Sequence, residues 1–104
     1  MAQFVKVAQL GQLPSGQALK VEVAGQEIAL FNLAGEVFAT SDRCTHMQAS
    51  LSEGQIKGDQ IVCPWHGLCF EIRTGKALGT RPWPSLRTYR VRVSGDDIEL
   101  EIEE

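Results

Sequence analysis

The sequence predicts an all-β fold. Short runs of alternating apolar and polar residues recur along the chain, and turn-forming pairs such as Gly58-Asp59 and Thr74-Gly75 separate them. No segment longer than about one turn repeats its apolar residues at the 3.6-residue period of a helix. The 104 residues contain no internal repeat, low-complexity tract or linker, so we expect one domain over residues 1–104.

The first half of the chain is expected to form strands over residues 4–10, 19–23, 27–33 and 37–39. A turn-rich segment that contains Pro14 separates the first two strands, and turns at residues 24–26 and 34–35 connect the others. This spacing predicts an antiparallel meander whose last strand leads into a loop at residues 41–47.

The second half is expected to form strands over residues 55–57, 60–62, 68–72, 86–93 and 98–102. The pair Gly58-Asp59 closes a hairpin between the first two of these strands, and the preceding residues 51–54 form a loop with about one helical turn. Residues 79–85 are irregular and carry Pro82, Trp83 and Pro84.

Every cysteine and histidine of the chain lies between Arg43 and Phe70. Cys44 and His46 form a C-x-H group, and after residues 47–62 the pair Cys63 and His66 forms a C-x-x-H group. A fold that brings the two loops together assembles two thiolates and two imidazoles, so we expect a metal site. Structural zinc modules usually pair two cysteines in one knuckle, which differs from this mixed spacing, but a zinc site remains an alternative.

This mixed motif resembles that of the Rieske family, in which two histidines replace two cysteines on one iron of a 2Fe-2S cluster. The resemblance covers about residues 31–102. It implies one 2Fe-2S cluster, with Cys44 and Cys63 on the inner iron and His46 and His66 on the outer, more exposed iron. It also implies the Rieske fold, an antiparallel β-sandwich framework with a small cluster-binding subdomain. The two ligand loops would lie at about residues 41–48 and 63–68, and a proline-containing loop at about residues 79–85 would cover the cluster.

The sequence differs from the high-potential, respiratory branch of this family. That branch has an extra cysteine in each ligand loop, whereas this chain has Met47, Gln48 and Ala49 after the first histidine and Trp65 in the second loop. The respiratory branch also has a serine and a tyrosine that donate hydrogen bonds to the cluster sulfurs, and this chain has Leu68 and Phe70 at those two positions. The resemblance therefore implies a potential in the lower part of the Rieske range, which is about −150 to +300 mV.

Three further features are open to interpretation. Cys69 alternates with apolar residues on an expected strand, so we interpret it as a thiol that is not a ligand. Trp65 and Trp83 either line a docking surface or cover the core. The acidic residues 96–104 form either the solvated face of a strand or a surface that steers a basic partner.

Composition limits the class of protein and its location. The net charge is −3, and the cations Arg87, Arg90 and Arg92 are spread along one expected strand, which argues against a nucleic-acid-binding module. Two of the three cysteines are assigned to the cluster, so no pair remains for a disulfide. The first six residues lack the basic start and the apolar run of a signal peptide, and no stretch approaches membrane-spanning length, so we expect a cytoplasmic location. We also expect a monomer.

The small size and the single motif resemble the Rieske-type ferredoxins of bacterial ring-hydroxylating oxygenase systems. The resemblance implies an electron carrier, not an enzyme, that links a flavin-containing, NAD(P)H-dependent reductase to a terminal oxygenase. Both partners would dock near His46 and His66. The small subunit of an assimilatory nitrite reductase is an alternative with the same domain, and a structural zinc-binding interaction module is an alternative of another class.

Overall fold

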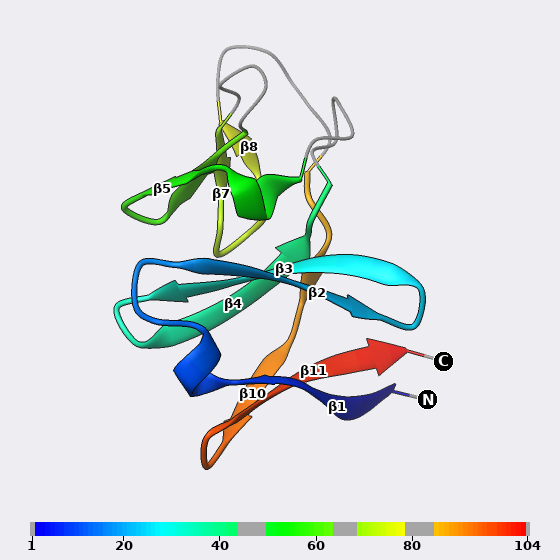
Figure 1. Ribbon diagram of the computed structural model, residues 1–104. Coiled ribbons are helices and arrows are strands. Elements are labelled where there is room, and N and C mark those ends of the chain that lie inside the picture. Colours follow the sequence, from blue (N-terminus) through cyan, green and yellow to red (C-terminus); the bar gives the residue numbers. More distant parts are fainter. Residues whose placement is uncertain (1, 44–49, 64–68, 79–84, 104) are drawn as a thin grey trace.

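The computed structural model describes residues 2–43, 50–63, 69–78 and 85–103 (Figure 1). Within these ranges the regular structure consists of antiparallel strands and two short 3-10 helices, η1 (Leu10–Gln12) and η2 (Leu51–Glu53). The expected all-β class is therefore confirmed. The described part holds no helix of the length and hydropathy that crossing a bilayer requires.

The strands form three antiparallel sheets. The first contains, in spatial order, β1 (Ala2–Gln9), β11 (Asp97–Glu103) and β10 (Val91–Ser94). The second contains β2 (Ala18–Val23), β3 (Gln26–Leu33), β4 (Glu36–Ser41) and β9 (Thr88–Tyr89). The third and smallest contains β5 (Gln55–Lys57), β6 (Gln60–Val62), β7 (Cys69–Glu71) and β8 (Ala77–Leu78).

Strand β3 lies between two hydrophobic clusters and contributes to both. Successive side chains of a strand point to opposite faces, and here Ile28 and Leu30 enter the cluster shared with the first sheet. Phe31 and Leu33 enter the cluster shared with the third sheet. A strand that is buried on both faces needs a continuous apolar run, which β3 has. Burial of one large side chain such as Phe31, which is fully buried, contributes about 1.5–3 kcal/mol.

The clusters explain how the sandwich and the small sheet are joined. The first two sheets enclose one cluster and form the sandwich framework, while the third sheet packs on the opposite face of the second. In Figure 1 the third sheet accordingly lies at one end of the molecule and β1, β10 and β11 lie at the other. This arrangement matches the expected framework with a small subdomain.

Tight turns set the register of the hairpins. Ala24 and Gly25 join β2 to β3 with φ values of 53° and 76°, and Val23 pairs directly with Gln26. Positive φ at both central residues is typical of the mirror-image turns that suit the twist of a hairpin. The expected hairpin at Gly58-Asp59 is confirmed by the pairing of Lys57 with Gln60.

Two details of the strand prediction are wrong. Residues 86–93 do not form one strand, because β9 pairs with β4 and β10 pairs with β11, and the chain crosses between the sheets at Arg90. The first strand does not join the meander either. Strand β1 pairs with β11, since η1 and the turn that follows carry the chain away from β1 before β2 begins.

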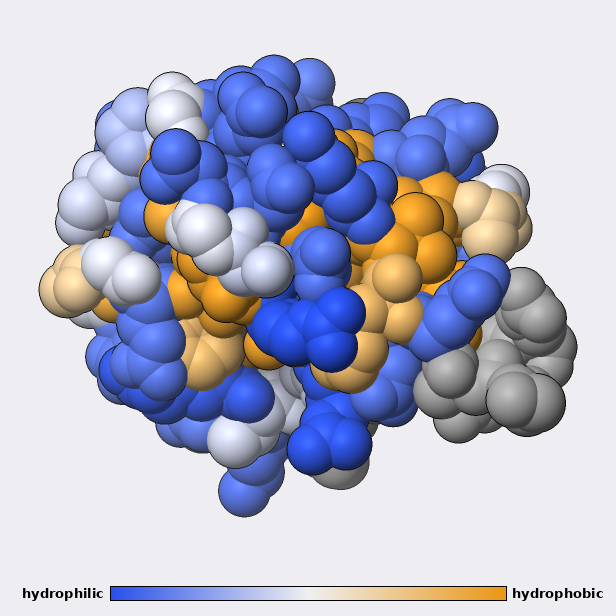
Figure 2. Space-filling model, turned by 90° about the horizontal axis from the view of Figure 1, so that it is seen from below, coloured by the Kyte–Doolittle hydropathy of each residue, from blue (hydrophilic) through white to orange (hydrophobic). Residues whose placement is uncertain are grey.

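The outer face of the first sheet is covered by ion pairs. Glu99 binds Arg92 at 2.7 Å, Asp97 binds Lys6 at 3.3 Å, and Glu101 lies 3.8 Å from a nitrogen of Arg90. Figure 2 shows this end of the molecule, where hydrophilic side chains cover much of the surface. Three carboxylates of β11 thus have cationic partners, on β1, on β10 and at Arg90 just before β10, as expected of the solvated face of a strand.

Candidate metal centre

The structure describes one of the four expected ligands, Cys63. Cys44, His46 and His66 lie outside the described residues. The same holds for Met47, Gln48 and Ala49, for Trp65 and Leu68, and for Pro82, Trp83 and Pro84. The geometry of the site therefore comes from the residues that border the two loops.

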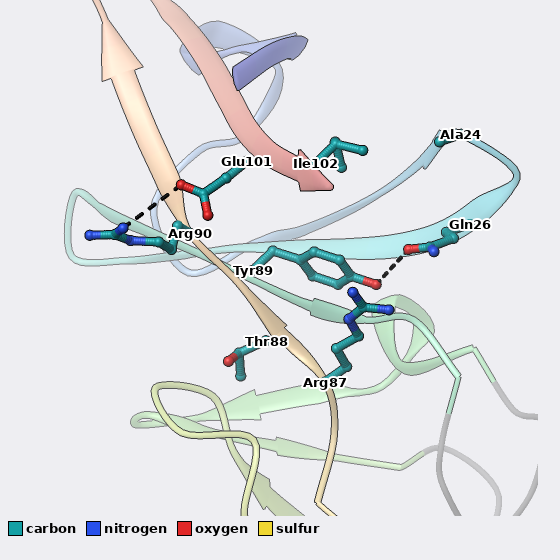
Figure 3. A pocket seen from close by; sticks show the side chains of 8 residues that line it. All are labelled: Ala24, Gln26, Arg87, Thr88, Tyr89, Arg90, Glu101 and Ile102. Atoms are coloured by element: carbon teal, nitrogen blue, oxygen red, sulfur yellow. Dashed lines mark hydrogen bonds and ion pairs between the residues drawn. The ribbon is translucent and has the colours of Figure 1, made fainter. Parts of the chain in front are cut away.

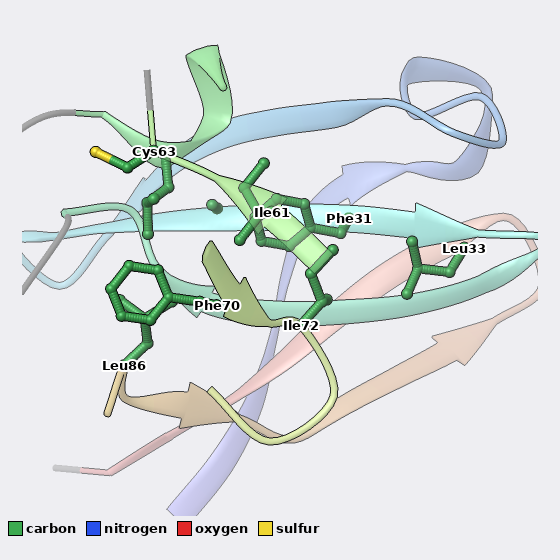
Figure 4. Packing of buried hydrophobic residues seen from close by; sticks show 9 residues of the cluster. Phe31, Leu33, Ile61, Cys63, Phe70, Ile72 and Leu86 are labelled. Atoms are coloured by element: carbon green, nitrogen blue, oxygen red, sulfur yellow. The ribbon is translucent and has the colours of Figure 1, made fainter. Parts of the chain in front are cut away.

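Cys63 follows strand β6 directly and is buried, with 1 % of its surface exposed. It belongs to the hydrophobic cluster that also contains Leu51, Phe70 and Leu86. In Figure 4 its sulfur lies at the end of this cluster that is farthest from Leu33. A soft sulfur donor is thus held at the boundary of the core and away from water, where an iron–sulfur cluster needs an inner ligand.

The first loop is closed at its base by a short bridge and by one carboxylate. Arg43 and Ser50, which border residues 44–49, form an isolated antiparallel β-bridge. Asp42 is fully buried, and its carboxylate accepts hydrogen bonds from the Ser50 hydroxyl at 2.5 Å and from the Ser52 backbone N–H at 2.9 Å. The start and the end of this loop are therefore held together.

The second loop is closed by the pairing of β6 with β7. Val62 pairs with Cys69 and Ile61 with Phe70, so the residues on either side of 64–68 are neighbours in one sheet. Cys69 is half-buried within β7, whose register with β8 places it opposite Leu78. Cys69 thus lies in a paired strand, and its assignment as a thiol outside the ligand set stays a prediction.

The bases of the two loops are packed against each other. Leu51 follows the first loop and Cys63 precedes the second, and both belong to the same buried cluster. At Gly54 a side chain would collide with the backbone carbonyl oxygen of Val62. The loops therefore leave the fold from adjoining positions, as a centre with ligands from both loops requires.

A group of three charged residues lies beside the first loop. Glu27 binds Arg43 at 3.1 Å through one carboxylate oxygen and Lys20 at 3.2 Å through the other. The hydrogen bond from Arg43, and then that from Lys20, holds the pKa of Glu27 below its usual value. The hydrogen bond to Glu27 likewise raises the pKa of Lys20. Arg43 immediately precedes Cys44, so this group helps to fix the entry to the loop.

A polar hollow lies alongside β9 (Figure 3). Tyr89 donates a hydrogen bond from its hydroxyl to Gln26 at 2.8 Å, and the Arg87 guanidinium lies 5.3 Å from the centre of the Tyr89 ring. A neighbouring hollow extends past Arg87 to Arg43 at the base of the first loop. Small-molecule substrates are usually held in pockets that are mostly apolar, so this open polar hollow does not resemble a substrate site.

The described residues fit a 2Fe-2S cluster bound between the loops. A buried cysteine stands at the base of one loop, the two bases adjoin, and Leu51 and Phe70, which share its hydrophobic cluster, are apolar and fully buried. A mixed pair of thiolates and imidazoles is the donor set of the Rieske cluster.

Four residues that shape this site were not singled out from the sequence: Asp42, Ser50, Ser52 and Gly54. All three residue types are common in loops: the side chains of Asp and Ser bond to nearby backbone groups, and Gly fits where there is no room for a side chain. The position of Asp42 two residues before the first cysteine is the one signal that the sequence offered.

Comparison with known proteins agrees with this geometry. The Rieske [2Fe-2S] domain matches residues 3–90 of the chain. The biphenyl dioxygenase ferredoxin subunit of Pseudomonas sp. (strain KKS102) is 42 % identical over 96 residues, which are 91 % of this chain and 88 % of that protein.

Two solved structures are also similar. One is from a complex of reduced oxygenase and oxidized ferredoxin in carbazole 1,9a-dioxygenase, with a TM-score of 0.86, 32 % identity and coverage of 93 % of this chain and 91 % of that chain. The other is a putative nitrite reductase NADPH (small subunit) oxidoreductase protein, with a TM-score of 0.81, 25 % identity and coverage of 94 % and 97 %.

The family match spans most of the chain, and it includes both halves of the cysteine–histidine motif and the buried Cys63. It also decides between iron–sulfur and zinc in favour of one Rieske-type 2Fe-2S cluster. The chain belongs to the Rieske [2Fe-2S] domain family.

Proposed function

We propose that this chain carries single electrons from a flavin-containing, NAD(P)H-dependent reductase to a terminal oxygenase of the ring-hydroxylating type. One observation carries the proposal: the relative that is 42 % identical is named as a ferredoxin subunit of a dioxygenase and is matched over 88 % of its length. The match also covers 91 % of this chain.

The cluster would be held by Cys44 and Cys63 on the inner iron and by His46 and His66 on the outer iron. The motif spacing supports this ligand set, and so does the burial of Cys63 at the base of the second loop. When bound, such a cluster accepts and releases one electron. The task of the chain's own residues is to fix the two loops, to exclude water from the inner side and to leave the histidine side accessible.

Both partners would dock near His46 and His66. A ferredoxin that is 32 % identical to this chain has been solved in a complex with its oxygenase, which supports an oxygenase as one partner. In this chain Arg43 and Arg87 border a hollow beside the first loop, and Glu27, which pairs with Arg43, lines it too. The cationic Arg87 there favours approach of an acidic surface. The proposal also includes a cytoplasmic location and a monomeric state.

The small subunit of a nitrite reductase is a second candidate, because one similar structure is described as such a subunit at 25 % identity. The higher identity of the dioxygenase ferredoxin subunit, 42 %, favours the oxygenase system.

Reconstitution of electron transfer tests the proposal. The purified protein is mixed with NADH, a flavin-containing reductase and a terminal oxygenase, and oxidation of the aromatic substrate is followed. We expect product to form only when this protein is present, and the Cys63→Ser variant serves as the control that lacks one expected ligand. Failure with a panel of such oxygenases, together with support of nitrite reduction by a sirohaem reductase, would overturn the proposal in favour of the second candidate.

A further inference from the structure

We propose that Asp42 is a positioning residue for the cluster, because its buried carboxylate fixes the base of the first ligand loop, to which Cys44 and His46 belong. The inference rests on the proposed ligand set. Asp42 itself is not a ligand in this proposal, and it acts through the backbone on either side of residues 44–49.

The contacts of Asp42 connect the start of the loop to its end. One carboxylate oxygen accepts the Ser50 hydroxyl at 2.5 Å and the other accepts the Ser52 backbone N–H at 2.9 Å. The backbone carbonyl oxygen of Asp42 also accepts the N–H of Leu51 at 2.6 Å. Three consecutive residues after the loop are thus bonded to a single residue before it.

The same residue connects the loop to the framework. The backbone N–H of Asp42 donates to the carbonyl oxygen of Glu27 in β3 at 3.1 Å. On the other side, Leu51 packs in the hydrophobic cluster of side chains that contains Cys63. A continuous series of contacts therefore leads from the framework through Asp42 and Leu51 to the buried ligand of the second loop.

Because Asp42 is buried, its carboxylate depends on these hydrogen bonds. Asp42 has no exposed surface, and a buried carboxylate is tolerated only when its oxygens receive strong hydrogen bonds. Removal of the carboxylate would leave the partly buried N–H of Ser52 without this acceptor, so the segment that carries Ser52 would move to satisfy it. An asparagine has the same shape, keeps one acceptor for Ser52, and can donate to the Ser50 hydroxyl.

Asn32 provides a matched control. It is also buried, with 7 % exposure, and its side chain also makes two hydrogen bonds, to the carbonyl oxygen of Leu13 and from the backbone N–H of Gly35, both at 2.8 Å. The bond from Gly35 holds the turn between β3 and β4, and the bond to Leu13 ties β3 to the segment after η1, so neither bond is made to a ligand loop. Asn32→Ala therefore removes similar bonding without touching the loops.

The test compares the holoprotein with the variants Asp42→Ala, Asp42→Asn and Asn32→Ala. The readouts are the rate of cluster loss to a chelator, the EPR g values of the reduced protein and the reduction potential, with urea unfolding of each variant as the measure of overall stability. Removal of a residue that orients metal ligands typically lowers metal affinity about 10- to 100-fold, so we expect Asp42→Ala to lose its cluster faster by about that factor and to show shifted g values and potential. Asp42→Asn should restore the wild-type spectrum, and Asn32→Ala should keep that spectrum despite its lower stability.

Two outcomes would overturn the inference: an Asp42→Ala protein with the g values and potential of the wild type, or an Asn32→Ala protein that shifts both by the same amount. If Asp42→Ala does not fold, Ser50→Ala removes one of the two side-chain bonds and should shift the same readouts in the same direction but less. An unchanged Ser50→Ala spectrum would then count against the proposal. These measurements need no electron-transfer partner, so their failure is distinct from failure of the proposed function.

Discussion

The backbone of Gly54 lies directly against the carbonyl oxygen of Val62. A Cβ atom at Gly54 would collide with that oxygen and would also lie 3.2 Å from the carbonyl oxygen of Leu51. The φ and ψ values of Gly54, −79° and −172°, are accessible to any residue, so glycine is required by the close approach and not by the backbone conformation. The segment after the first ligand loop therefore packs directly against the strand that leads to Cys63.

Gly54→Ala is therefore expected to lower the free energy of unfolding by about 1–3 kcal/mol, as overpacking usually does, and to reduce the iron content per chain. The control is Gly11→Ala, since a Cβ atom at Gly11 meets nothing within 4 Å. Urea unfolding and iron analysis measure both effects. Equal stability and equal iron content of the two variants would show that the contact is not needed.

The sequence was sufficient to predict the all-β class, because the alternating runs and the turn pairs survive in the structure almost unchanged. It did not predict the break at Arg90, because the alternation of residues 86–93 continues while the partner strand changes from β4 to β11. Such a change depends on tertiary packing, which a local pattern does not record.

The candidate site was predicted in part. The motif identified the residue types, but it did not indicate how the loops are held. Asp42 resembles an ordinary polar loop residue in the sequence, and its burial becomes evident only when Ser50 and Ser52 are brought back to it by the fold. Likewise, the need for glycine at position 54 depends on the proximity of Val62, eight residues farther along the chain.

The ligand set is tested by five substitutions. Cys44→Ser, His46→Ala, Cys63→Ser and His66→Ala are each expected to abolish the visible absorption of the cluster, because each removes one of four ligands. Cys69→Ser should keep that absorption, because Cys69 lies in β7 and pairs with Val62 and Leu78. A bleached Cys69→Ser protein alongside an intact spectrum in one of the other four would show that the assignment is wrong.

The ion pairs of Glu27 predict a pH-dependent contribution to stability. Because Arg43 and Lys20 lower the pKa of Glu27 in the folded state below its ordinary value of 4.5, the contribution is fully present above that value. It is lost as the pH falls through the folded-state pKa. Glu27→Gln should therefore be less stable than the wild type at neutral pH, and the difference should narrow below pH 4.5.

Urea midpoints of both proteins across this pH range measure the effect, with cluster absorption recorded in the same samples so that cluster loss is separated from protonation. Added salt should reduce the difference at neutral pH, since all three side chains are partly exposed. A difference that stays constant through the acidic range would mean that Glu27 acts by packing and not by charge.

The last prediction concerns the reduction potential and depends on Phe70. This side chain is fully buried in the hydrophobic core that contains Cys63. It has no hydroxyl group to donate to a sulfur of the 2Fe-2S cluster. Reduction adds negative charge to the centre, and a nearby donor would stabilise that charge. We therefore expect the wild-type potential to lie in the lower part of the Rieske range of about −150 to +300 mV.

Phe70→Tyr should raise the potential, and so should Leu68→Ser in the second loop. A hydrogen bond to a charged group contributes at most about 3 kcal/mol, and for one electron 59 mV corresponds to about 1.4 kcal/mol, so one bond raises the potential by at most about 130 mV. Protein-film voltammetry of variants with an intact cluster spectrum measures the shift. A tyrosine hydroxyl that fails to reach a sulfur would instead be buried without a partner, which lowers the unfolding free energy by about 1–3 kcal/mol and leaves the potential unchanged. An unchanged potential in both variants, or a wild-type potential near the top of the range, would show that missing donors do not set the potential.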